Sequence, residues 1–147
     1  MTSTESAPPF GQQITFLNTS DLEAATAFYR DVVGLPVAYS APGYVNFFQS
    51  TPSAFIAVCL REPGSREPGD ASGAIPTFVV STEAEVDVWN DKLTKAGVEV
   101  TKAAGPGVSS DGKEIAAIYN CMCRDPSGYL VEFQMFRDPH WPQPQSW

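Results

Sequence analysis

The chain has 147 residues, 43% of them hydrophobic, which is enough for one compact domain with its own core. Its formal net charge is −8 and its 9 Lys and Arg residues are scattered, which argues against nucleic acid and anionic membrane surfaces as partners. Residues 1–9 lack the basic and apolar segments of a secretion signal, and no apolar run could span a bilayer, so we expect a cytoplasmic protein with no membrane partner.

After a terminal tail at residues 1–10, the first half of the chain predicts the order β-α-β-β-β. A helix is predicted over 21–33, because its apolar residues recur every three or four positions and form one stripe. Strands are predicted where branched and aromatic residues gather between turn signals, at 13–18, 36–40, 44–49 and 54–61.

A stretch rich in Pro, Gly and charge, residues 62–73, predicts a linker to a second unit of the same order. That unit has a helix predicted over 83–96 and strands predicted over 75–80, 98–102, 114–124 and 129–136. The Gly-rich segment 103–113 is expected to be a loop, either a lid or a surface decoration. The tail at 137–147 holds three prolines and two tryptophans, so we expect it to pack on its own domain or on a partner subunit.

The two halves repeat the same local signals. Each helix follows a hydroxyl residue with Glu three positions later, the pattern of a capping box, at Ser20–Glu23 and Thr82–Glu85. Each final strand follows a Pro-Ser-small turn, at Thr51–Ala54 and Asp125–Gly128. The sequence therefore predicts an α+β fold in which one βαβββ module is duplicated.

The final predicted strand carries a carboxylate, Glu132, within an aromatic and branched run. A buried carboxylate is costly unless it is paired, hydrogen-bonded or bound to a metal, so Glu132 is the first candidate for a functional residue. When the prolines of the two turns are matched, Val58 occupies the corresponding position in the first half. Gln134 is expected on the same face as Glu132, because side chains alternate along a strand.

Two patterns together resemble a known superfamily. The first is Asp21-Leu22 followed by Phe28-Tyr29 and Gly34-Leu35, and the second is Asp125-Pro126-Ser127-Gly128 with Glu132 four residues later. They resemble the vicinal oxygen chelate superfamily, which includes glyoxalases, bleomycin resistance proteins and extradiol dioxygenases. The likeness covers residues 12–136. It implies modules at 11–61 and 74–136 that form a curved mixed sheet around a cleft, and it implies a homodimer.

The resemblance also implies where a metal would bind, because metal-using relatives take ligands from the first and last strand of each module. Glu132 matches one of these positions, whereas the other three fall on Ile14, Val58 and Ile75, or on Pro76 in place of Ile75 if the register slips by one residue. None of these side chains can bind a metal. The single histidine, His140, lies beyond the last strand. We therefore expect no cofactor, and a divalent metal is disfavoured.

Strand alternation predicts the lining of the cleft if the face that carries Glu132 is turned toward it. Such a lining is mostly apolar with a few polar groups, as is usual in small-molecule pockets, and the aromatic residues suit stacking on a flat ligand. The predicted ligand-binding residues are Ile14, Phe16, Asn18, Phe47, Val58, Ile75, Thr77 and Gln134. The alternative is that the apolar members are simply core and the polar members lie at a rim.

The leading functional hypothesis is a metal-independent protein that binds a small, largely apolar or aromatic molecule, as the bleomycin resistance branch does by sequestration. The alternative is a lyase, isomerase or cyclase in which Glu132 is the acid or base and Asn18 or Gln134 holds an oxyanion. A metal-dependent glyoxalase or dioxygenase is disfavoured by the number of ligands. Whether the protein is an enzyme stays open at this stage.

Overall fold

The computed structural model describes residues 12–60, 74–109 and 111–140. The predicted tail at 1–10, the predicted linker at 62–73 and most of the C-terminal segment 137–147 lie outside the described residues.

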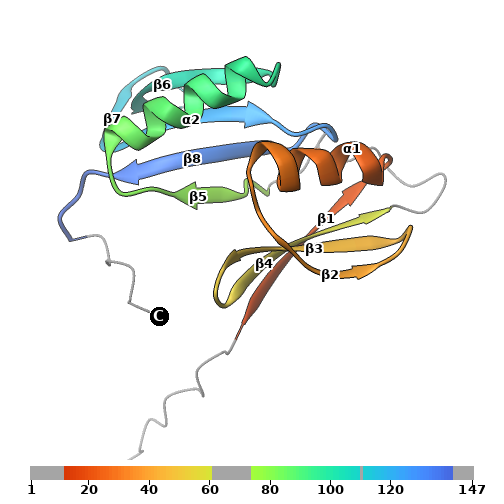
Figure 1. Cartoon of the computed structure of the whole chain (residues 1–147). Coiled ribbons are helices and arrows are strands. Elements are labelled where there is room, and N and C mark those ends of the chain that lie inside the picture. The colour runs from red at the N-terminus through yellow and green to blue at the C-terminus, as the bar shows by residue number, and fades with distance from the viewer. Residues whose placement is uncertain (1–11, 61–73, 110, 141–147) are drawn as a thin grey trace, which may run out of the picture.

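The chain forms two four-stranded sheets with the same topology (Figure 1). The first sheet has the order β1-β4-β3-β2 and comprises β1 (Gln13–Thr19), β2 (Val37–Ala41), β3 (Val45–Thr51) and β4 (Ala54–Leu60). The second has the order β5-β8-β7-β6 and comprises β5 (Thr77–Val79), β6 (Val100–Val108), β7 (Glu114–Arg124) and β8 (Leu130–Phe136). In each sheet the first strand runs parallel to the last and the other pairs are antiparallel. The predicted α+β duplication is confirmed.

One helical segment follows the first strand of each sheet. In the first module α1 (Leu22–Thr26) continues as the π-helical η1 (Ala27–Val32), where the Val33 N–H reaches back to the Phe28 carbonyl. In the second module α2 (Glu83–Lys95) is regular. Among the described helices none has the length and apolar character of a membrane span.

The two helices begin with different caps. Thr82 caps α2 as predicted, and its hydroxyl accepts the Glu85 N–H at 3.1 Å. The prediction of Ser20 as the cap of α1 is wrong, because Asp21 takes that position and its carboxylate accepts the Ala24 N–H at 3.0 Å. Both residue types are good caps, so adjacent Ser and Asp left two possible helix starts.

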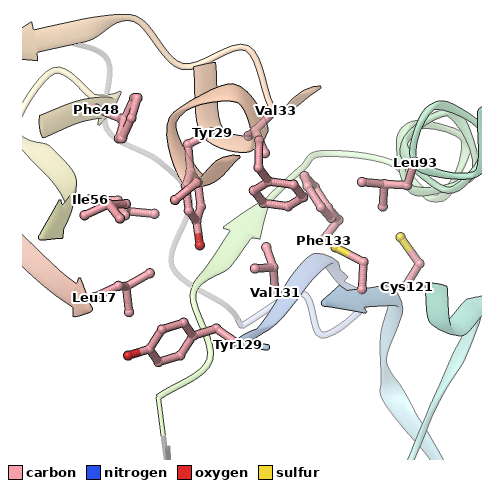
Figure 2. Close-up of a cluster of buried hydrophobic side chains, with 14 of the residues drawn as sticks. Leu17, Tyr29, Val33, Phe48, Ile56, Leu93, Cys121, Tyr129, Val131 and Phe133 are labelled. Atoms are coloured by element: carbon pink, nitrogen blue, oxygen red, sulfur yellow. The ribbon is translucent and has the colours of Figure 1, made fainter. Parts of the chain in front are cut away.

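The helix-facing sides of both sheets meet in one hydrophobic core. Figure 2 shows Tyr29 and Phe48 of the first module in the same cluster as Val131 and Phe133 of the second. A buried hydrogen bond also joins the modules, from the Tyr29 hydroxyl to Asp125 Oδ2 at 2.9 Å. The modules therefore pack through their helix sides, and the opposite face of each sheet is left open.

Strand β6 is longer than predicted. The segment 103–108 pairs with β7, with Gly105 opposite Asn120 and Pro106 opposite Tyr119, so the prediction of a loop over 103–113 is wrong for most of its length. A Cβ on Gly107 would lie 2.3 Å from Ile118 Cγ1, so glycine is needed there for close approach between strands. Only the turn after Val108 remains of the predicted loop.

Candidate functional site

The open face of the first sheet carries Ile14, Phe16 and Asn18 of β1, as strand alternation predicted. The expectation that Val58 shares this face is wrong. Val58 pairs with Leu17, points into the core and is 1% exposed. The two turns differ in length, since Thr51 pairs with Ala54 directly across two turn residues whereas residues 125–129 separate Arg124 from Leu130. Matching their prolines therefore shifted β4 by one residue, which exchanges its faces.

Aromatic side chains dominate this first open face. Phe47 meets both Phe16 and Tyr39 edge-on, with ring centroids 5.8 and 5.7 Å apart. Phe16 is 61% exposed and Tyr39 is 65% exposed, which is unusual for side chains of this size. Ile14, Tyr39, Phe47 and Phe55 line part of a hollow of about 420 Å³. The face can therefore contact a flat apolar group.

The open face of the second sheet is polar and centres on Glu132. Its carboxylate accepts hydrogen bonds from the Thr77 hydroxyl at 3.0 Å and from Asn120 Nδ2 at 2.6 Å. With its amide nitrogen turned toward Glu132, Gln134 donates a third hydrogen bond at 2.7 Å. Strand pairing places these groups together, because Thr77 lies opposite Glu132 and Asn120 lies opposite Gln134. We call Thr77, Asn120, Glu132 and Gln134 the carboxylate cluster.

Asn120 is the member of the carboxylate cluster that the sequence reasoning missed. It is 4% exposed, and its Oδ1 has no hydrogen-bond partner among the described residues. Lys102 lies close by and donates to the Asn120 backbone carbonyl at 3.1 Å; burial lowers the pKa of its ammonium group. The available signal was an amide in a strand that is otherwise apolar around it, between Tyr119 and Cys121.

The predicted site residues thus fall into two groups on different sheets. Ile14, Phe16, Asn18 and Phe47 lie on the first open face, whereas Thr77, Glu132 and Gln134 lie on the second. Ile75 is exposed and lies two residues before the start of β5, and its carbonyl accepts a hydrogen bond from the Thr77 hydroxyl at 3.2 Å. Thr77 also borders a second hollow of about 500 Å³, whose wall includes Gln13, Thr15 and Phe55 of the first module.

The donor set does not fit a resident divalent metal. Three side-chain donors already engage the Glu132 carboxylate, and the corresponding position on β1 is the apolar Ile14. In the described ranges no group of three or more His, Cys, Asp or Glu residues gathers, and His140 is exposed beside Asp138. A zinc, iron or nickel site usually needs several such ligands.

Two buried cysteines of β7 lie on the helix side of the second sheet, opposite the carboxylate cluster. Burial raises the pKa of Cys121 to about 11 and the pKa of Cys123 to about 12. Because the thiolate is the nucleophilic form, the raised pKa makes both thiols weaker nucleophiles at neutral pH than an ordinary cysteine. They are packing residues of the core.

The family model described as the Glyoxalase/Bleomycin resistance protein/Dioxygenase superfamily matches residues 11–133. A lactoylglutathione lyase from Agrobacterium tumefaciens is 28% identical over 88% of this chain and 96% of its own, with a TM-score of 0.64. A glyoxalase/bleomycin resistance protein/dioxygenase from Nocardioides is 20% identical over 97% and 93%, with a TM-score of 0.69. A glyoxalase-related enzyme from Fulvimarina pelagi is 22% identical over 90% and 91%, with a TM-score of 0.67. The search of curated proteins gives no match.

Proposed function

The chain belongs to the Glyoxalase/Bleomycin resistance protein/Dioxygenase superfamily, and we propose that it binds a small, largely apolar or aromatic molecule without a metal ion. The observation that carries this proposal is the aromatic open face, where Phe16, Tyr39 and Phe47 contact one another beside a hollow of about 420 Å³. Mostly apolar walls with a few polar groups are typical of small-molecule sites. Exposed aromatic rings supply the area for stacking.

Titration of the purified chain with 2-naphthol, a flat neutral aromatic probe, tests this proposal by calorimetry. We expect saturable binding that survives treatment with EDTA and weakens at least about fivefold in Phe47→Ala, because the loss of a ring contact costs on the order of 1 kcal/mol. Val88→Ala is the matched control, since Val88 is an apolar residue 64% exposed on α2, away from both open faces. Absence of saturable binding, or binding that EDTA abolishes, would contradict the proposal.

A second candidate function is catalysis by Glu132 in a lyase, isomerase or cyclase. The fixed position of this carboxylate favours it, because three donors hold both oxygens at 2.6–3.0 Å. The oxyanion role foreseen for Gln134 fits poorly, since its amide nitrogen is directed at Glu132 and an oxyanion there would be repelled. Asn18 lies on the other sheet.

Turnover assays separate the two functions. One solved relative is a lactoylglutathione lyase, so lactoylglutathione is the first compound to assay. An enzyme that uses Glu132 would lose at least about 100-fold in rate in Glu132→Gln, the usual contribution of a general acid or base. If the chain only binds its ligand, neither wild type nor Glu132→Gln should show turnover, whether or not Zn²⁺ or Ni²⁺ is added.

We further propose a homodimer that forms through exposed apolar side chains of the first module. Large apolar side chains are exposed on the first module, and contiguous exposed apolar surface is typical of an interface; they are Ile14, Phe16, Val37, Tyr39 and Tyr44. Light scattering after gel filtration should give twice the mass of the chain. In Tyr39→Glu the mass should fall to that of a monomer, because the interface would bury an unpaired charge.

A cytoplasmic location is also part of the proposal. The cysteines Cys59, Cys121 and Cys123 are free thiols, as is usual in a reducing compartment. Cell fractionation with an antibody against the chain tests it, and recovery in a secreted or membrane fraction would contradict it.

A further inference from the structure

The carboxylate cluster contains a buried hydrogen-bond acceptor that lacks a donor. Asn120 is 4% exposed, and its Nδ2 is committed to Glu132 at 2.6 Å. Its Oδ1 has no partner among the described residues. Buried polar atoms in proteins nearly always have a partner, so this atom needs a donor from outside the described chain.

The nearby donors of the protein are already engaged. Lys102 Nζ donates to the carbonyls of Ala103, Gly105 and Asn120 at 3.1–3.4 Å. The Gln134 amide nitrogen and the Thr77 hydroxyl are directed at Glu132. Since Oδ1 and Nδ2 of Asn120 share one carbon atom, the unpaired acceptor lies next to the Glu132 carboxylate. An ionised carboxylate also accepts hydrogen bonds and cannot donate them.

We infer that the carboxylate cluster binds a ligand with a pair of N–H donors, as an amidine or an amino-substituted heterocycle has. These N–H groups donate to the Glu132 carboxylate and to Asn120 Oδ1. This inference goes beyond the proposed function, because the carboxylate cluster lies on the second open face and the aromatic residues of the proposed function lie on the first. Two adjacent acceptors select donors and reject carboxylates, because a second anion there would be repelled and left unpaired. The net charge of −8 acts in the same direction, whereas the nearby Lys102 ammonium group, which interacts with Glu132, acts against it.

The surroundings of the carboxylate cluster fit an apolar body on such a ligand. Met122 pairs with Glu132 across the sheet, and Val79 pairs with Gln134, so both flank the cluster on the same face. Val79 is exposed and Met122 is partly exposed. A ring or short alkyl group attached to the N–H pair would cover these side chains.

Calorimetric titration of the full chain with benzamidine, benzamide and benzoate tests the inference. We expect benzamidine to bind at least about tenfold more tightly than benzoate, with benzamide between them. Asn120→Ala and Glu132→Gln should each weaken benzamidine binding at least about fivefold, whereas Glu114→Gln, which removes an exposed carboxylate of the same sheet, should change it less than about twofold. Benzamidine should also shift the Asn120 side-chain NH₂ resonances in ¹⁵N spectra of the wild-type chain.

The outcomes separate this inference from the proposed function. If 2-naphthol binds and benzamidine shows no preference over benzoate, the inference is wrong and the binding function stands. Unchanged benzamidine affinity in Asn120→Ala would also overturn the inference, because a trapped water would then satisfy Oδ1. If neither 2-naphthol nor any of the three benzene derivatives binds, both fail.

Discussion

The two modules share a topology but have diverged on one face. On the helix side both contribute to one core, where Tyr29 and Phe48 pack with Val131 and Phe133. On the open side the first module carries exposed rings such as Phe16, and the second carries the carboxylate cluster. Because side chains alternate along a strand, one face can be held constant by packing while the other changes. Duplication here preserved the core and left the open faces free to acquire different chemistry.

The largest expected effect tests whether side chains on the core face and on the open face contribute differently to the stability of the fold. Phe133 is fully buried and stacks on Trp89 with ring centroids 4.6 Å apart. Phe133→Ala should lower the free energy of unfolding by about 3–5 kcal/mol, from lost burial and the cavity left behind. Phe16→Ala, which removes the same ring from the first open face, should cost less than about 1 kcal/mol. Equal losses in urea unfolding would show that the two faces are not distinct.

A smaller effect is expected where the modules meet. Tyr29→Phe would leave the buried Asp125 Oδ2 without its donor and should cost about 1–3 kcal/mol in urea unfolding. Tyr119→Phe is the matched control, because the Tyr119 hydroxyl donates to Asp87 at 2.8 Å on the surface. That control should cost less than about 0.5 kcal/mol. If Tyr29→Phe leaves the free energy of unfolding unchanged, the shared apolar core alone joins the modules.

The helix caps allow the modules to be compared at equivalent positions. Asp21→Ala and Thr82→Ala should each lower stability by about 1 kcal/mol, because each leaves a backbone N–H at the first turn without its acceptor. Ser20→Ala should change stability by less than about 0.3 kcal/mol, since Ser20 precedes the cap. Thermal unfolding measures all three, and a loss at Ser20 equal to that at Asp21 would refute the assigned cap.

Signals local in sequence predicted the duplicated fold. The Thr82 cap, the Asp125–Gly128 turn and the helical stripes each depend on a few neighbouring residues, so they survive without tertiary information. The side of the sheet on which Val58 lies was not predictable in this way, because a shift of one residue in register exchanges the two faces of a strand. The lack of space for a side chain at Gly107 comes from Ile118 on the neighbouring strand, which composition cannot show.

The candidate site was predictable only in part. Strand alternation grouped Glu132 with Gln134 and Ile14 with Phe16 correctly, because these pairs lie on single strands. It could not show that the two pairs lie on separate open faces, since the packing of modules depends on long-range contacts. Asn120 was missed for the same reason, because its importance comes from a partner on the neighbouring strand.

The smallest effect expected concerns pH and two aspartates in different surroundings. Burial raises the pKa of Asp125, although the Tyr29 hydroxyl and backbone N–H groups oppose that change. Ionisation therefore costs the folded state more than the unfolded state, and this contribution to stability falls as pH rises from the ordinary pKa of aspartate to the raised one. The exposed Asp111 is the opposite case, because its hydrogen bond with Ser109 lowers its pKa. Its contribution is present above the ordinary pKa and is lost as pH falls through the lowered one.

The variants Asp125→Asn and Asp111→Asn convert this contrast into a measurement. Urea unfolding is measured at intervals between pH 3 and pH 6. The free energy of unfolding of wild type relative to Asp125→Asn should decline as pH rises, and the decline should be smaller than the loss of about 1 kcal/mol expected from removing a helix cap. The free energy of unfolding of wild type relative to Asp111→Asn should rise over the same interval. The rise should be slight, because solvent screens the Asp111 side chain. Slopes of the same sign would mean that burial at the junction of the modules does not control the ionisation of Asp125. The structural difference between the buried turn of the second module and an exposed loop would then carry no energetic consequence.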